Sequence, residues 1–368
     1  MRLYKNCNIP DKNFSIRKAN IFVESGKITA ILPPYVEPEN CEKVELKGAL
    51  IIPGLTDIHV HGAKGISFAH KEVDKVLEAY RAQREKGTRF LLATLVSLPE
   101  KKLKAALKSI KEAQKEEPAI LGAYIEGPFI NPEKSGGMRK DYITAWKLKE
   151  FLPIIEEFGD VIKIVTVAPE RKEAAELAEI LHKNGIKVAL GHSEARYEEC
   201  RAFEKRLSLF THLFNAMGSF HHRKPGIAGF ALESAKLCEI IPEKHHLHEA
   251  AIKIAFKAKG KEGIIPVSDG TPLSATNETT EAIFSGKRVR KRDGAVFTED
   301  GRLFGSSITL MEGLKYLVST GIYRNLQEAV IYNLKNTHWL LGHRVWTEKG
   351  LELPLVAVYS DSWRLLTR

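Results

Sequence analysis

Two histidines separated by one residue, His59 and His61, follow an apolar run and precede a glycine. The run at residues 49–52 predicts a buried strand that leads into them. Because strand side chains alternate between faces, both imidazoles would lie on one face of the chain. Neutral imidazole binds zinc and iron well, and two such ligands need one carboxylate or a third histidine to complete a site. The pair alone also fits two solvent-facing histidines.

Four further polar residues occupy an equivalent place, each at the end of an apolar run typical of a strand: Glu126, His192, His212 and Asp269. A carboxylate in such a place is costly to bury unless it is paired or bound to a metal. Each residue taken singly has an ordinary structural explanation. Together with His59, five His, Glu and Asp positions at strand ends predict a metal-dependent hydrolase.

These positions can converge only if the apolar runs are neighbouring strands. From residue 50 onward, eight such runs mostly alternate with segments of helical spacing, which predicts an α/β protein with a parallel sheet. The simplest form is a closed (β/α)8 TIM-like barrel, whose active sites lie at the carboxyl ends of the strands. A doubly wound open sheet is the alternative, and it does not readily bring the strand ends to one spot. The runs after the first cover residues 90–96, 120–126, 161–167, 186–192, 207–212, 236–241 and 263–269.

The first fifty residues form short strand-like segments with a hairpin signal at residues 24–26. They contain too few apolar residues for a core of their own. We therefore predict a small β-sandwich domain formed by the N- and C-terminal segments: residues 1–50 with parts of 280–303 and 343–368. Residues 51–342 are predicted to form the metal-dependent barrel.

The composition is that of a globular protein in a reducing compartment. Of the 368 residues, 43% are hydrophobic and 28% are charged, which is ordinary for a soluble chain. The four cysteines are scattered without Cys-x-x-Cys spacing, so they predict neither a disulfide framework nor a cysteine zinc site. No apolar run approaches the roughly 20 residues that span a bilayer, and the start lacks a signal-peptide core. We expect a cytoplasmic protein without membrane association.

The formal net charge of +10 favours an anionic partner, either nucleic acid or a small anionic substrate. Most lysines, however, are mixed with glutamates, a pattern typical of solvated helix faces. The densest basic run, residues 287–292, has no interleaved aromatic residues. We interpret it as an exposed loop or hairpin tip, and we expect no nucleic-acid partner.

The segments around these residues resemble the amidohydrolase superfamily and, within it, the family of N-acetylglucosamine-6-phosphate deacetylases. The Glu-Gly-Pro element at 126–128 and the Thr-His-x-x-Asn-Ala-Met element at 211–217 are distinctive of that family. The resemblance implies hydrolysis of the acetamide of N-acetylglucosamine 6-phosphate to glucosamine 6-phosphate and acetate. The matching segments are 53–62, 126–132, 191–193, 211–217, 223–226, 303–306 and 336–342.

The resemblance also implies a role for each matching residue. Glu126, His192 and His212 would bind the main catalytic metal, and Asp269 would be the catalytic acid and base. His59 and His61 match a pair that some members keep for a second metal, so the implied cofactor is one or two divalent ions per subunit, Zn or Fe(II). The partner would be a small amino sugar phosphate, bound in a homodimer whose arginine reaches the phosphate across the interface. The implied substrate contacts are Gly137, Met138, Asn215, Ala216, Arg223, His246 and Phe304.

Three positions depart from the family pattern near the implied substrate pocket. Met138 stands where the family usually has a histidine, Glu243-Lys244 replaces Asp-Gly, and Gly270 replaces an alanine after the catalytic aspartate. None of these changes removes an implied metal ligand or Asp269. Hydrolysis is therefore expected, while the sugar or acyl group can differ. The alternatives are a deacetylase for another N-acyl amino sugar, such as N-acetylgalactosamine 6-phosphate, a related amidohydrolase with altered specificity, and a non-catalytic scaffold, which the intact residue set disfavours.

Overall fold

The computed structural model describes residues 1–367 of the chain, which divide into two compact units. The larger unit consists of residues 57–86 and 90–313, and the smaller unit of residues 1–56, 87–89 and 314 onward. Among the described residues, no helix is both long and apolar enough to cross a membrane.

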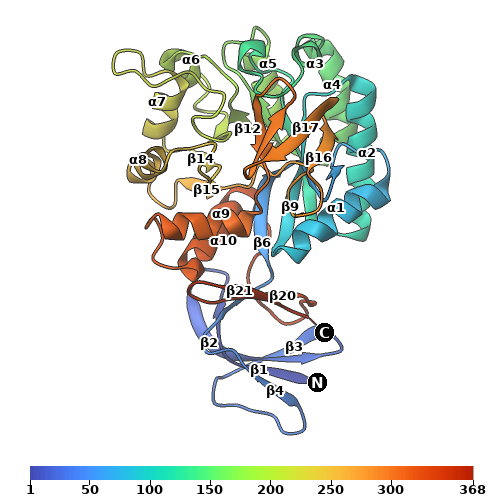
Figure 1. Ribbon diagram of the computed structural model, residues 1–368, viewed down its shortest axis with the longest axis vertical. Helices are drawn as coiled ribbons and strands as arrows, with labels where there is room; N and C mark the ends of the chain where they lie inside the picture. Colours follow the sequence, from blue (N-terminus) through green and yellow to red (C-terminus); the bar gives the residue numbers. More distant parts are fainter. Residues whose placement is uncertain (368) are drawn as a thin grey trace. The chain divides into compact units, whose positions relative to one another are not determined.

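The larger unit is built on a barrel of eight strands that neighbour one another in chain order (Figure 1). A parallel bridge between Val60 and Gly270 joins the first strand to the segment after the last, and the Asp269 N–H donates to the His59 carbonyl at 2.9 Å. The predicted (β/α)8 barrel is confirmed. Its strands are β6 (Leu55–Val60), β9 (Thr88–Val96), β10 (Ile120–Glu126), β11 (Ile162–Val167), β12 (Lys187–Leu190), β13 (Leu207–Phe210), β14 (Leu237–Ile240) and β15 (Ile264–Pro266).

Helices cover the outside of these strands (Figure 1). In α2, Leu103, Leu107 and Ile110 are buried and recur at the spacing of one helix face, which is why the sequence there reads as an amphipathic helix. The strands themselves are buried on both faces and read as nearly continuous apolar runs. The helices of this unit are α1 (Val73–Glu85), α2 (Glu100–Glu116), α3 (Lys140–Thr144), α4 (Leu148–Phe158), α5 (Ala174–Lys183), α6 (Tyr197–Arg201), α7 (Gly226–Glu233) and α8 (Glu249–Lys259).

A separate antiparallel sheet is formed by β16 (Glu281–Phe284), β17 (Lys287–Arg292), β18 (Ala295–Thr298) and β19 (Leu303–Ser306). The prediction that part of 280–303 completes the small domain is wrong, because these strands pair with one another and belong to the larger unit. Their buried residues Phe284, Val289 and Val296 pack in one apolar cluster with Met138. That cluster supplies the core they need.

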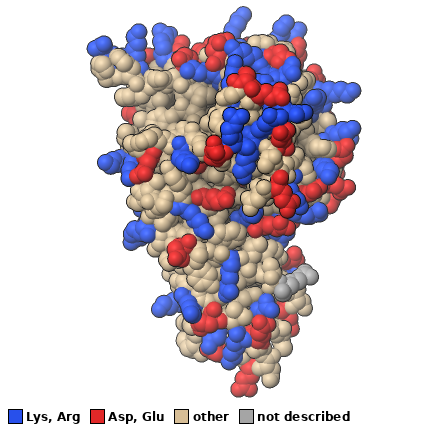
Figure 2. Space-filling view, in the orientation of Figure 1, with Lys and Arg blue, Asp and Glu red and all other residues tan. Residues whose placement is uncertain are grey.

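The basic run 287–292 is a strand of that sheet, where it pairs with both β16 and β18, and is therefore not a loop or hairpin tip. Two of its exposed arginines lie near acids: Arg290 is 2.9 Å and Arg288 is 3.6 Å from Glu281. Figure 2 shows Lys and Arg interspersed with Asp and Glu over the visible face of the larger unit. Such mixing is typical of a solvated surface.

The smaller unit contains one seven-stranded sheet to which both ends of the chain contribute, as predicted. β20 pairs with β5, next to β1, and buried residues from both ends share one core, including Ile21 and Leu355. The strands are β1 (Arg2–Pro10), β2 (Ile16–Glu24), β3 (Lys27–Leu32), β4 (Glu42–Glu45), β5 (Leu50–Ile52), β20 (Leu355–Val358) and β21 (Trp363–Leu366).

The helix α10 (Leu326–Leu341) also groups with the smaller unit, together with the end of α9 (Leu310–Ser319), although the sequence assigns residues up to 342 to the barrel. The reason lies in polar side chains on α10. The Asn333 amide donates to the Thr56 carbonyl at 3.0 Å and accepts from its N–H, and Gln327 donates to the Val358 carbonyl.

His343 makes this unit sensitive to acid. Its Nε2 lies 2.8 Å from the Thr56 hydroxyl, and burial lowers its pKa to about 4 from the ordinary value of 6.5. The unfolded chain therefore binds a proton more readily than the folded chain, and stability is lost as the pH falls from about 6.5 to about 4.

The variant His343→Gln keeps an acceptor but does not titrate. When the pH is lowered from 7 to 4.5, we expect its free energy of unfolding to fall by about 2 kcal/mol less than that of the wild type. Urea unfolding of both proteins at the two pH values measures the difference. Equal acid losses in the two proteins would contradict the assignment.

Candidate active site

The site lies at the carboxyl ends of the barrel strands. His59 is on β6, Glu126 ends β10, and the remaining candidates follow their strands by one to three residues. Three of them have positive φ: His192 at 46°, His212 at 27° and Asp269 at 49°. Such backbone costs about 1–3 kcal/mol per residue and persists where surrounding structure holds it, as at functional sites. The strand ends thus turn sharply, and all six candidates are buried.

One group of possible ligands consists of Glu126, His192 and His212. Glu126 Oε1 lies 2.8 Å from the Nε2 atoms of both histidines, which are 3.1 Å apart. The Nδ1 of His192 lies 2.6 Å from the Lys134 carbonyl, a contact that fixes the ring and leaves Nε2 for a metal. These three atoms can serve one ion.

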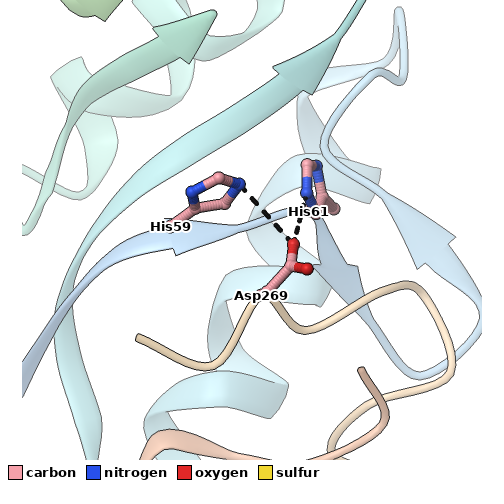
Figure 3. Close-up of side chains that lie close together, drawn as sticks. All are labelled: His59, His61 and Asp269. Atoms are coloured by element: carbon pink, nitrogen blue, oxygen red, sulfur yellow. Dashed lines mark hydrogen bonds and ion pairs between the residues drawn. The ribbon is translucent and has the colours of Figure 1, made fainter. Parts of the chain in front are cut away.

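A second group consists of His59, His61 and Asp269. Figure 3 shows both imidazoles of the β6 segment directed at the aspartate. Asp269 Oδ1 lies 2.9 Å from His61 Nε2 and 3.5 Å from His59 Nε2. Glu126 also faces this group, since its oxygens lie 3.7 Å from His61 Nε2 and 3.8 Å from His59 Nε2. The two groups therefore adjoin through Glu126.

The electrostatics of the site favour a cation. Burial by itself lowers the pKa of His59, but Glu239, Glu126 and Asp269 outweigh it and raise that pKa to about 10. In the same way, Glu126 raises the pKa of His212 against the effect of burial. The buried Nε2 of His59 has no hydrogen-bond partner and faces carboxylates. Nitrogen and carboxylate donors in this arrangement fit a divalent metal ion, which would take the place of the protons.

Two acidic residues behind the ligands were missed by the sequence reasoning. Glu239 on β14 is fully buried and lies 2.9 Å from His59 Nδ1. Asp57 Oδ1 accepts the N–H groups of His59 and Ser268, each at 3.3 Å, and burial raises the pKa of Asp57 to about 7. Each of these acids lies inside an apolar, strand-forming run, and that position was the indication in the sequence that could have found them.

A cavity of about 160 Å³ opens over the predicted ligands. Every member of the two ligand groups except His59 lines this cavity. Six of the seven predicted substrate contacts line it as well: Gly137, Met138, Asn215, Ala216, His246 and Phe304. Arg223 is not among the lining residues; it is exposed, in a turn closed by the bridge between His221 and Lys224. The structure thus brings together all predicted site residues except Arg223.

One side of the cavity is an apolar wall. Gly137 lies so close to Phe304 that an added Cβ would come within 2.0 Å of its ring. Phe304 stacks on Phe284 of β16 with centroids 4.4 Å apart, and Phe284 lies 5.1 Å from the His61 ring. Met138 is buried in the same cluster. The antiparallel sheet therefore supplies part of this wall, of which the sequence assigned Phe304 to the site but not Phe284.

His246 is held by Glu243, one of the two neighbouring residues that depart from the family pattern. Its Nδ1 hydrogen-bonds to Glu243, and its backbone N–H donates to the same carboxylate at 2.7 Å. Burial raises the pKa of Glu243, but His246 outweighs that effect and lowers it overall. Glu243 therefore fixes the imidazole that lines the cavity.

The comparisons with known proteins agree with this geometry. The amidohydrolase family model matches residues 50–330. The chain is 31% identical to an N-acetylglucosamine-6-phosphate deacetylase of Bacillus subtilis (strain 168), over 99% of this chain and 95% of that protein. It is 28% identical to an N-acetylgalactosamine-6-phosphate deacetylase of Escherichia coli O157:H7, over 82% and 79%.

Among solved structures, the N-acetylglucosamine-6-phosphate deacetylase of Pasteurella multocida is similar with a TM-score of 0.88 and 29% identity, covering 100% of this chain and 98% of that one. The family model, the sequence relatives and the structural similarity all cover the barrel. The chain belongs to the amidohydrolase family, among the N-acetylglucosamine-6-phosphate deacetylases.

Proposed function

We propose that this chain hydrolyses the acetamide of N-acetylglucosamine 6-phosphate to glucosamine 6-phosphate and acetate. The observation that carries the proposal is the shared cavity. The Glu126, His192 and His212 group and Asp269 open into the same space as the segments that match the family's sugar contacts. An amide is a poor electrophile, and both the metal group and an acid–base residue address that difficulty.

A divalent cation bound there would polarise a carbonyl and make water more acidic. Asp269 supplies the proton transfers. Burial raises its pKa, but the hydrogen bond with His61 and the nearby His59 outweigh burial and lower it, so the carboxylate is ionised and can act as a base. It takes a proton as water adds to the acetyl carbon, and it returns that proton to the amine nitrogen as the carbon–nitrogen bond breaks.

Substrate binding in this proposal uses the other lining residues. We infer that Asn215, Ala216 and His246, which line the cavity, contact the sugar phosphate, and that the apolar wall would exclude water from the acetyl group. The exposed guanidinium of Arg223 presents a planar fork suited to phosphate oxygens. We propose that Arg223 serves a second subunit of a homodimer, which light scattering combined with size-exclusion chromatography can test.

The metal is proposed to be Zn or Fe(II), with one or two ions per subunit, since imidazole and carboxylate ligands suit both. The proposed location is the cytoplasm, supported by four free cysteines, of which Cys7, Cys200 and Cys238 are buried thiols. The intermixed surface charges support the absence of a nucleic-acid partner.

Acetate release from three compounds tests the function: N-acetylglucosamine 6-phosphate, its galactosamine epimer and unphosphorylated N-acetylglucosamine, each with Zn or Fe(II) supplied. Preferred turnover of the first supports the proposal. Preference for another compound, or no turnover of any of them, contradicts it.

The second candidate substrate is N-acetylgalactosamine 6-phosphate, supported by the E. coli relative and by Met138 at the cavity wall. A thioether cannot donate a hydrogen bond to a sugar hydroxyl, whereas an imidazole can. We expect Met138→His to change the ratio of kcat/KM between the two epimers by about tenfold or more. The matched Met138→Leu variant should leave that ratio within about threefold of the wild type, because its volume and polarity are similar. An unchanged ratio in both variants would show that Met138 does not touch the sugar.

A further inference from the structure

We propose that Glu239 is a positioning residue for a second divalent cation, which it serves by fixing the His59 ring so that Nε2 faces His61 and Asp269. The inference rests on the proposed metal-dependent function and adds a residue that touches neither the cavity nor the reacting atoms.

The hydrogen bonds of Glu239 determine which nitrogen of His59 carries the proton. Glu239 Oε2 lies 3.2 Å from the backbone nitrogen of His212 and 2.9 Å from His59 Nδ1. A backbone N–H can only donate, so Oε2 acts as an acceptor there. A carboxylate oxygen in that role also accepts from His59, and the ring proton therefore lies on Nδ1.

With the proton on Nδ1, a neutral His59 ring presents a lone pair at Nε2. That atom is buried and has no hydrogen-bond partner. It lies 3.5 Å from Asp269 Oδ1 and 3.8 Å from Glu126 Oε1, so an unprotonated nitrogen faces two carboxylate oxygens. These donors repel one another unless a positive charge lies between them, either a second ring proton or a bound cation that takes its place.

Glu239 should act more strongly on the His59, His61 and Asp269 group than on the Glu126, His192 and His212 group. It contacts the side chain of His59 but only the backbone of His212. The ring of His192 is held instead by the Lys134 carbonyl. Loss of Glu239 would therefore release one ligand ring of the second ion and none of the rings that bind the first.

The experiment counts metal ions in two graded variants. Glu239→Gln keeps the size and an acceptor oxygen but loses the charge, and Glu239→Leu removes the acceptor. Metal-free protein is titrated with Zn²⁺ and, for the visible spectrum, with Co²⁺, and bound ions are counted by mass spectrometry after dialysis. Cys238→Ala is the matched control, because Cys238 is the neighbouring buried residue of the same strand and points to the other face.

We expect two ions in the wild type and in Cys238→Ala. The second ion should bind about 10-fold more weakly in Glu239→Gln and about 100-fold more weakly in Glu239→Leu, while the first stays within about threefold. If Glu239→Leu does not fold, the comparison of Glu239→Gln with Cys238→Ala decides. Wild-type affinity for both ions in the variants, equal weakening of both ions, or a single ion in the wild type overturns the proposal. The count requires no sugar, so failure of the deacetylase assay leaves this result interpretable.

Discussion

Asp269→Asn is expected to lower kcat by about 10²- to 10⁴-fold, with KM changed far less. Asparagine keeps the shape of the side chain but can neither take the proton of water nor return it to the amine. Without that proton the amine is a very poor leaving group, so both halves of the reaction fail together. Acetate release at saturating substrate measures the loss.

The control for Asp269→Asn is its metal content. Glu126, His192 and His212 are untouched by the substitution and should retain their ion, so the loss of turnover must be measured on metal-loaded protein. The second group loses a carboxylate, and its ion is expected to bind more weakly. Turnover within about tenfold of the wild type would contradict the role of Asp269 as acid and base.

The barrel could be predicted because of where its strands lie. Strands buried on both faces appear in the sequence as continuous apolar runs. A polar residue at the end of such a run indicates the catalytic face, as Glu126 and His212 do. The antiparallel sheet could not be placed in this way. Phe284, Val289 and Val296 are buried apolar residues on three successive strands, and their sequence carries no information about which core receives them. In the structure the receiving surface includes Val96 at the end of β9, Met138 and Leu273.

The same limit applies within the site. Glu126, His192, His212 and Asp269 were found because each interrupts an apolar pattern at a strand end. Glu239 lies inside its strand, where a charged residue would ordinarily indicate a solvent-facing position. Only the closure of the barrel, which puts the Glu239 carboxylate within reach of His59 and His212, shows that it is buried and hydrogen-bonded to both.

Glu126→Gln is expected to abolish turnover and to weaken metal binding by more than about 100-fold. Glu126 Oε1 lies 2.8 Å from two histidine nitrogens, and the other oxygen faces His61 at 3.7 Å, so this carboxylate is the ligand common to both groups. A neutral amide oxygen keeps the volume but loses the negative charge that balances the cation.

The measurement for Glu126→Gln is the shift in unfolding temperature on adding a chelator. A ligand that binds only the folded state stabilises it by about 4 kcal/mol when its concentration is 1,000 times Kd. The wild type should therefore lose stability when a chelator removes the metal, whereas Glu126→Gln should not. Glu133→Gln is the matched control: this carboxylate is exposed, pairs with Lys140 at 2.8 Å and should leave the chelator shift unchanged. A normal shift in Glu126→Gln would mean that the imidazoles and Asp269 hold the metal without Glu126. The carboxylate at the centre of both groups would then serve the substrate, and the assignment of ligands would have to move from Glu126 to Asp269.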